Sequence, residues 1–111
     1  MKLPSTIRFA NPSIKQAFYG LENGNAEEKE LFNAIKKAFV SIKENAFCGT
    51  QIPKALIPKQ YIQDYGIKNL WKYDLHGGWR LTYSIRTEGV IIISLIIEYF
   101  SHKEYERRFN Y

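Results

Sequence analysis

The sequence predicts a small α+β domain in which an N-terminal strand and a helical hairpin pack on an antiparallel sheet. Two observations predict this class. Helix caps and an apolar stripe mark the first half, whereas the second half holds a three-strand meander with glycine turns and a short terminal helix. The 111 residues suit one domain, since domains cluster near roughly 100–150 residues. No linker or repeat divides the chain, so residues 1–111 are expected to form a single domain.

The first half begins with a short predicted strand at residues 5–9 and continues as two helices. Asn11 has the side chain of an N-cap and Pro12 fits the first helical position, so a helix is expected from there to about Leu21. Asn25 can cap a second helix. The apolar face of this second helix consists of Leu31, Phe32, Ile35, Ala38, Phe39 and Ile42.

Two shorter helices are expected around the sheet. Residues 44–59 contain one glycine and two prolines and are predicted to be irregular, and the short helix that follows ends at Gly66. A last helix is predicted over residues 101–111, because Ser101 and Glu104 have the spacing of a capping box.

The second half predicts three strands in a meander, at residues 70–75, 79–86 and 90–99. In the stretch 90–97, both the odd-numbered and the even-numbered residues are apolar apart from Ser94, so both faces of this strand would be apolar. A strand of this kind is usually central, so both of its faces are expected to be covered.

Alternation along the first two strands of the meander separates an apolar face from a polar one. The apolar side chains are Trp71, Tyr73, Leu75, Trp79, Leu81, Tyr83 and Ile85. With matching registers, one concave surface would hold the polar side chains Lys72, Asp74, Arg80 and Thr82. His102 and Tyr105 follow the last strand and are expected to reach the edge of that surface.

Composition excludes several classes of protein. The net charge of +5 permits a polyanionic partner such as nucleic acid but does not require one. One cysteine and two histidines leave no disulfide and little for a metal cluster, so neither a metal nor a cofactor is expected. The chain lacks the apolar run of a signal peptide and the roughly 20 apolar residues that cross a bilayer, so we expect a cytoplasmic protein that does not engage a membrane.

Two C-terminal motifs resemble those of the RelE/ParE toxin superfamily. The segment GGWRLTYSI, at residues 77–85, is similar to the family's G-[YW]-R-[LV]-x-Y-x-[VI] strand, and SHKEYERRF, at 101–109, resembles its closing His-x-x-Tyr segment. Upstream, the stretch IPKALIPKQYIQDYGIKNLWKYDL, at 52–75, resembles an archaeal-type branch of the family. The order of helical hairpin and three strands also agrees, so the resemblance covers most of the chain and implies a RelE-like fold.

The resemblance implies the toxin of a type II toxin–antitoxin system, which would cleave mRNA on the ribosome as an endoribonuclease. Its partners would be the ribosome, mRNA and a small acidic antitoxin. In this metal-independent chemistry a ribose 2′-OH attacks the adjacent phosphorus, which requires a proton acceptor, a proton donor and cations at the phosphorane. Two alternatives stay open, namely a ParE-like inhibitor of DNA gyrase and a non-catalytic RNA- or protein-binding member of the fold.

Carried onto this chain, the resemblance implies four catalytic residues. Arg80 would grip phosphate oxygens, or else pair with Asp74 across the hairpin. His102 would transfer protons, since histidine titrates at about pH 6.5, or else be a surface residue at the helix start. Lys72 matches a second cation, and Tyr105 would stack on a base, assist proton transfer or pack against the sheet. Asp74 stands where the family often has a cation, and it either weakens phosphate binding or accepts a proton.

Four further cations are candidate contacts for RNA phosphates, namely Lys103, Arg107, Arg108 and Arg86. The alternative for the last helix is an i, i+4 salt bridge between Glu104 and Arg108. If one phosphate is to touch both Arg80 and His102, these side chains must lie within about 10 Å of each other.

Overall fold

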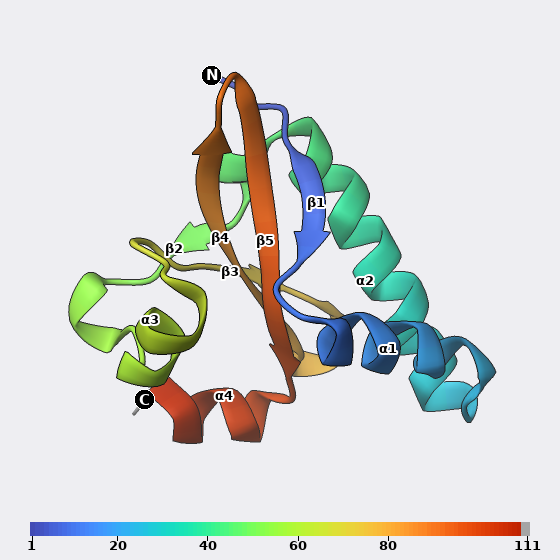
Figure 1. The fold of residues 1–111 in the computed structure, drawn as a ribbon. Helices are drawn as coiled ribbons and strands as arrows, with labels where there is room; N and C mark the ends of the chain where they lie inside the picture. The colour runs from blue at the N-terminus through green and yellow to red at the C-terminus, as the bar shows by residue number, and fades with distance from the viewer. Residues whose placement is uncertain (110–111) are drawn as a thin grey trace.

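The computed structural model describes residues 1–109 and contains one five-stranded sheet with helices on both faces (Figure 1). The predicted α+β class is confirmed. The strands are β1 (Thr6–Phe9), β2 (Thr50–Gln51), β3 (Trp71–Asp74), β4 (Arg80–Glu88) and β5 (Ile91–Phe100). The helices are α1 (Pro12–Gly20), α2 (Ala26–Glu44), α3 (Lys59–Tyr65) and α4 (His102–Phe109). The predicted end of the last helix, residues 110–111, lies outside the described residues.

The strand order is β1–β5–β4–β3–β2, and the meander of β3, β4 and β5 has the predicted connectivity. The sheet is mixed rather than purely antiparallel, because β1 pairs with β5 in the parallel sense. Parallel neighbours require a long crossover, and the helices and strands between β1 and β5 provide it. The segment 44–59, predicted to be irregular, includes the two-residue strand β2, which extends the sheet beyond β3.

The helix boundaries follow the local signals in the sequence. Asn11 caps α1 by accepting the backbone N–H of Ile14 at 2.9 Å. Asn25 caps α2 and forms a full capping box with Glu28. Gly66 ends α3 with φ +63°, a left-handed conformation that favours glycine. Within residues 1–109 no helix combines the length and the apolar character that a membrane span needs.

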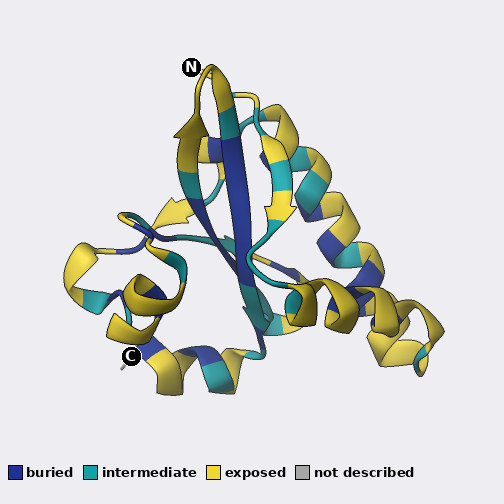
Figure 2. Ribbon diagram, in the orientation of Figure 1, coloured by how far each residue is buried: buried dark blue, intermediate teal, exposed yellow. Residues whose placement is uncertain are grey.

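Strand β5 is covered on both faces, as its apolar sequence predicts, and is buried over most of its length (Figure 2). Helices α1 and α2 cover one face with a core of Phe18, Leu21, Leu31, Phe32, Ile35, Ala38, Ile42, Leu75, Leu81, Tyr83 and Ile96. The opposite core lies under α3 and α4 and consists of Ile52, Ile57, Tyr61, Ile67, Leu70, Ile93, Leu95, Ile97, Phe100, Tyr105 and Phe109. Two separate cores therefore meet at one sheet.

A β-bulge in β5 changes the direction of its side chains. Thr82 pairs with Glu98, but the next residue, Tyr83, pairs with Ile96, so that Ile97 is left over. Ile97 belongs to the core beneath α3 and α4, and the neighbouring Glu98 side chain bonds to residues of those same helices. The bulge therefore places a carboxylate on the face that α4 covers.

Tyr83 ties the middle of the sheet to the segment that follows α2. Its side chain is fully buried, its hydroxyl donates to the carbonyl of Ala46 at 2.6 Å, and the N–H of Gly49 donates to it at 3.1 Å. Burial raises the pKa of Tyr83 far above its ordinary value, so this hydroxyl stays protonated and remains a donor.

We predict that Tyr83→Phe lowers the free energy of unfolding by about 1–3 kcal/mol, because it leaves buried backbone groups without their partner. Chemical denaturation measures the loss. Tyr73→Phe is the matched control, since its hydroxyl makes only a long contact of 3.5 Å with Ser41. Equal losses in the two variants would show that the buried hydroxyl of Tyr83 has no special role.

Candidate functional site

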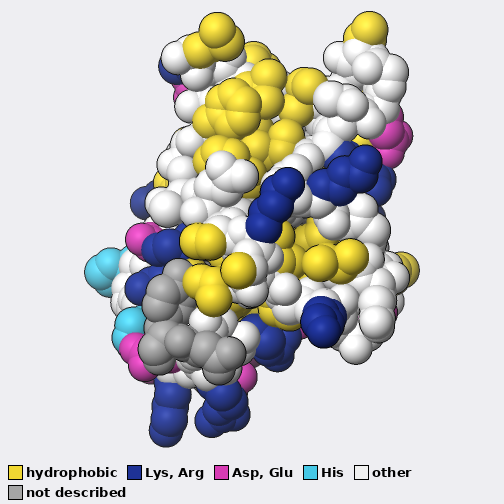
Figure 3. All heavy atoms as spheres, turned by 90° about the vertical axis from the view of Figure 1, so that its left-hand side faces the viewer, with side chains coloured by type: hydrophobic (Ala, Val, Ile, Leu, Met, Phe, Trp, Pro, Cys, Tyr) yellow, Lys and Arg dark blue, Asp and Glu magenta, His cyan; other side chains and the backbone are white. Residues whose placement is uncertain are grey.

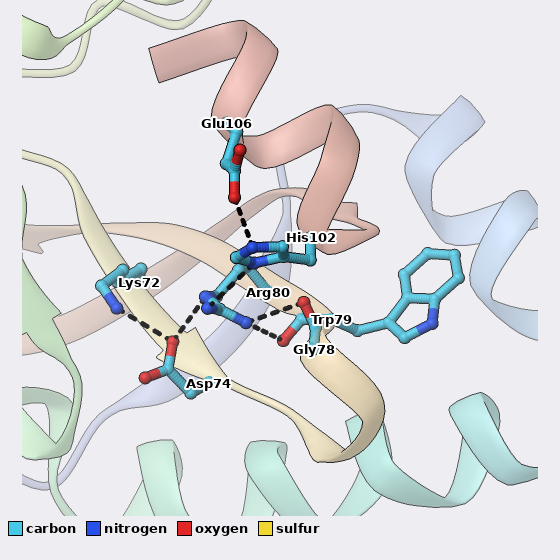
Figure 4. Close-up of polar contacts among 7 residues, drawn as sticks. All are labelled: Lys72, Asp74, Gly78, Trp79, Arg80, His102 and Glu106. Atoms are coloured by element: carbon cyan, nitrogen blue, oxygen red, sulfur yellow. Dashed lines mark hydrogen bonds and ion pairs between the residues drawn. The ribbon is translucent and has the colours of Figure 1, made fainter. Parts of the chain in front are cut away.

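Arg80 and His102 lie side by side at one end of the sheet (Figure 4). Arg80 begins β4 and pairs in register with Phe100, the last residue of β5, and α4 starts two residues later at His102. The guanidinium Nη2 lies 3.4 Å from His102 Nδ1. This separation is well within the roughly 10 Å that a shared phosphate would allow.

The turn before β4 packs closely against the start of α4. Gly78 has φ +83°, and a Cβ at this position would lie 3.2 Å from the Cβ of His102. Arg80 Nη1 donates to the carbonyl oxygens of Gly78 at 2.7 Å and Trp79 at 3.3 Å. The guanidinium is therefore held by its own turn, and that turn has no space for a larger side chain beside His102.

Asp74 lies between the two cations of the site. Its Oδ1 is 2.8 Å from Arg80 Nε and 3.0 Å from Lys72 Nζ. Figure 4 shows the Asp74 carboxylate facing both side chains. Asp74 and Arg80 are register partners on adjacent antiparallel strands, which explains why the two side chains meet. The ion pair between Arg80 and Asp74, which the sequence allowed as an alternative to phosphate binding, is therefore present. Because the Asp74 side chain is 58% exposed, solvent screens the attraction, and an incoming anion can compete with it.

Tyr105 packs beneath these cations and is only 4% exposed. Its ring centre lies 5.5 Å from the Arg80 guanidinium carbon and 5.9 Å from Lys72 Nζ, and it packs against Phe109 with a centroid separation of 4.7 Å. A ring buried in this way is not exposed for stacking on a base. Of the roles that the sequence allowed for Tyr105, packing against the sheet is the one that the structure supports. Its ring also lies against the cationic ends of Arg80 and Lys72.

Thr82 lies on the same face of the sheet as its register partner Lys72, as strand alternation predicts, but it is not exposed there. Its side chain is fully buried, and its hydroxyl donates to the backbone carbonyl of Glu98 at 3.3 Å. Helix α4 covers this part of the sheet, so Thr82 belongs to the shared face as a buried residue. Of the other three residues on this face, Asp74 is exposed, and Lys72 and Arg80 are half-buried.

Glu106 is a member of the site that the sequence analysis did not single out. Its Oε1 pairs with His102 Nε2, on the opposite side of the imidazole from Arg80. The two residues are four positions apart on α4, and this i, i+4 spacing is the signal that could have identified the pair.

The basic residues of α4 differ in how freely they can reach a phosphate. Lys103 is exposed, and Arg107 pairs with Glu104 at 2.9 Å while its side chain stays 69% exposed. Arg108 pairs with Glu98 at 3.1 Å and Glu104 pairs with Arg107, so the alternative of an i, i+4 salt bridge between Glu104 and Arg108 is not what the structure shows. Among the predicted RNA contacts on α4, Lys103 and Arg107 are the most accessible.

Arg86 is not gathered into the site. It lies six residues beyond Arg80 on β4, which corresponds to about 20 Å of strand, and it pairs with Glu88 at 2.9 Å. On the side of the molecule shown in Figure 3, basic side chains are scattered over the lower half, with acidic and histidine side chains between them at one edge. Folding therefore brings together Lys72, Arg80 and His102 but leaves Arg86 at a distance.

A partly exposed hydrogen-bond network holds α4 against α3 and the sheet. The Tyr61 hydroxyl bonds to Glu98 Oε2, which also accepts from Arg108 at 3.1 Å. Burial, together with the Glu98 carboxylate, raises the pKa of Tyr61 far above its ordinary value, so the phenol remains a hydrogen-bond donor. This network fixes α4 and, through it, the position of His102.

Comparisons of the chain with protein-family models, with curated proteins and with solved structures each found no match. Among residues 1–109, no three histidine, cysteine, aspartate or glutamate side chains are grouped so that they could hold a metal ion. The groups available at this site are thus two fixed cations, one imidazole and two carboxylates.

Proposed function

We propose that this protein is a metal-independent endoribonuclease that cleaves mRNA on the ribosome, as the toxin of a toxin–antitoxin pair. One observation carries the proposal: Arg80 Nη2 lies 3.4 Å from His102 Nδ1. A permanent cation and a proton-transfer group at this separation can act on the same phosphodiester. The two motifs that resemble the RelE/ParE superfamily supply the substrate class.

The proposed reaction begins at His102. Arg80 has donors only, so the Nδ1 atom that faces it carries a lone pair. When the phosphate draws the guanidinium onto its own oxygens, this lone pair is free to accept the proton of a ribose 2′-OH. The 2′-oxygen then attacks the adjacent phosphorus and the bond to the 5′-oxygen breaks, which leaves a 2′,3′-cyclic phosphate and a 5′-hydroxyl. Arg80 and Lys72 stabilise the added negative charge, and we assign the proton of the leaving oxygen to the Lys72 ammonium.

An apolar groove beside β1 supports the expected antitoxin partner. The groove has a volume of about 530 Å³ and lies next to β1, an edge strand of the sheet. Its lining includes Tyr19, 50% exposed, and Val40, 66% exposed. Two lysines, Lys36 and Lys43, and one carboxylate, Glu22, also line it, so its net charge is positive. Exposed apolar side chains beside lysines suit an acidic amphipathic segment of the antitoxin, whereas a second copy of this basic chain would be repelled.

A second candidate function, RNA binding without cleavage, is favoured by Asp74. This carboxylate already neutralises part of the charge of Arg80 and Lys72, the two cations that the reaction needs. A site adapted for binding tolerates such an internal counter-ion better than one that must stabilise a phosphorane.

We predict that Arg80→Ala and His102→Ala each lower the rate of mRNA cleavage on translating ribosomes by at least about 100-fold, because charge stabilisation or proton transfer is lost. Primer extension on a defined message measures the rate. His76→Ala is the control, since this second histidine is exposed in the turn before β4. Full activity in both site variants would refute the assignment, and inhibition of DNA relaxation by gyrase would favour the alternative target.

We predict that Asp74→Asn strengthens binding of single-stranded RNA by about three- to tenfold at low salt, because Arg80 and Lys72 lose their shared counter-ion. Fluorescence anisotropy at two salt concentrations measures the change. Asp64→Asn is the control, since it alters the net charge equally but pairs only with Gln60 on α3. An equal gain in both variants would mean that Asp74 acts through net charge alone. Tighter binding with no cleavage product would support the non-catalytic function.

We predict that Val40→Asp weakens the complex with the antitoxin by at least about tenfold, because it places a negative charge in the apolar groove and repels an acidic partner. Calorimetric titration with the product of a neighbouring reading frame that encodes a small acidic protein provides the measurement. Val90→Asp is the control, because Val90 is 98% exposed at the tip of the β4–β5 hairpin. Undiminished binding by Val40→Asp would place the partner elsewhere.

A further inference from the structure

The imidazole of His102 is held from both sides. Arg80 Nη2 lies 3.4 Å from Nδ1, and the Glu106 carboxylate pairs with Nε2 (Figure 4). Glu106 is on the same helix, one turn further on, and its side chain is 47% exposed. The His102 side chain itself is 58% exposed, so part of the ring is open to a substrate.

These two neighbours demand the same tautomer of His102. A guanidinium has only donors, so the Nδ1 atom that faces Arg80 must offer a lone pair. In neutral imidazole the proton is then on Nε2, where the Glu106 carboxylate, which has only acceptors, receives it. The third group of a catalytic arrangement commonly orients a base in this way.

We propose that Glu106 is a positioning residue, which holds His102 in the Nε2–H tautomer and directs the Nδ1 lone pair toward the phosphate-binding side of Arg80. The inference rests on the proposed function for its catalytic consequence, but the tautomer is a property of the free protein. Glu106 itself touches no reacting atom, since the ring of His102 lies between it and Arg80.

The other charged groups near the ring do not share this role. Asp74 and Lys72, on β3, reach the ring only through Arg80. Glu104, the other acidic residue of α4, pairs with Arg107. Glu104 therefore offers a matched control on the same helix, of the same chemical type and with similar exposure.

Nitrogen and carbon chemical shifts of the His102 ring test the tautomer directly, measured at a pH where the ring is neutral. We expect the Nε2–H form in the natural protein and in Glu106→Gln, whose amide oxygen still accepts the proton. In Glu106→Ala we expect the Nδ1–H population to rise above that of the natural protein, although Arg80 still faces Nδ1 and keeps it below that of an unrestrained histidine, and Glu104→Gln should leave the ring signals unchanged. Ring signals in Glu106→Ala identical to those of the natural protein would overturn the inference.

Cleavage on the ribosome supplies the second readout. We expect Glu106→Ala to lower the rate about tenfold, as part of the benefit of proton transfer is lost, and Glu106→Gln to restore it to within about twofold. Glu104→Gln should cleave at the natural rate. If His102→Ala cleaves normally, the proposed function fails, while the ring signals still decide the tautomer. If His102→Ala is inactive and Glu106→Ala is fully active, Glu106 has no positioning role.

Discussion

Strand β5 has apolar side chains on both of its faces, so exposing either face to water would be unfavourable. The arrangement of the other elements depends on this constraint. Helices α1 and α2 cover one face, while α3 and α4 cover the other, so the sheet separates two cores. The bulge at Ile97 shifts the alternation of side chains between the two faces near the end of the strand. As a result the Glu98 side chain points toward α4. The burial of one strand thus decides where the last helix must lie.

The candidate site is a consequence of how α4 is fixed. Tyr105 and Phe109 are buried against the sheet, and Arg108 bonds to Glu98, so the first turn of the helix meets the first residue of β4. His102 and Arg80 come together at that junction, although they are 22 residues apart in the sequence. Carboxylates flank the pair on both sides, because Asp74 pairs with Arg80 and Glu106 pairs with His102.

Much of the fold could be predicted because its signals are local. Asn11, Asn25 and Gly66 each satisfy or terminate a helix end within a few residues, and the structure confirms all three roles. Strand alternation identified the apolar faces of β3 and β4 for a similar reason, since side chains alternate whatever lies above them. The shared surface of Lys72 and Arg80 followed from the same alternation.

Other features depended on contacts between distant segments. Thr82 is buried because α4 lies over it, and Arg108 turns to Glu98 rather than Glu104 because the bulge presents that carboxylate. The parallel pairing of β1 likewise depends on where the crossover returns the chain. The sequence by itself determined the helices, the meander and the types of residue available for chemistry. Only the tertiary structure decided which of them meet, because the position of α4 results from burial of apolar surface that no short segment can specify.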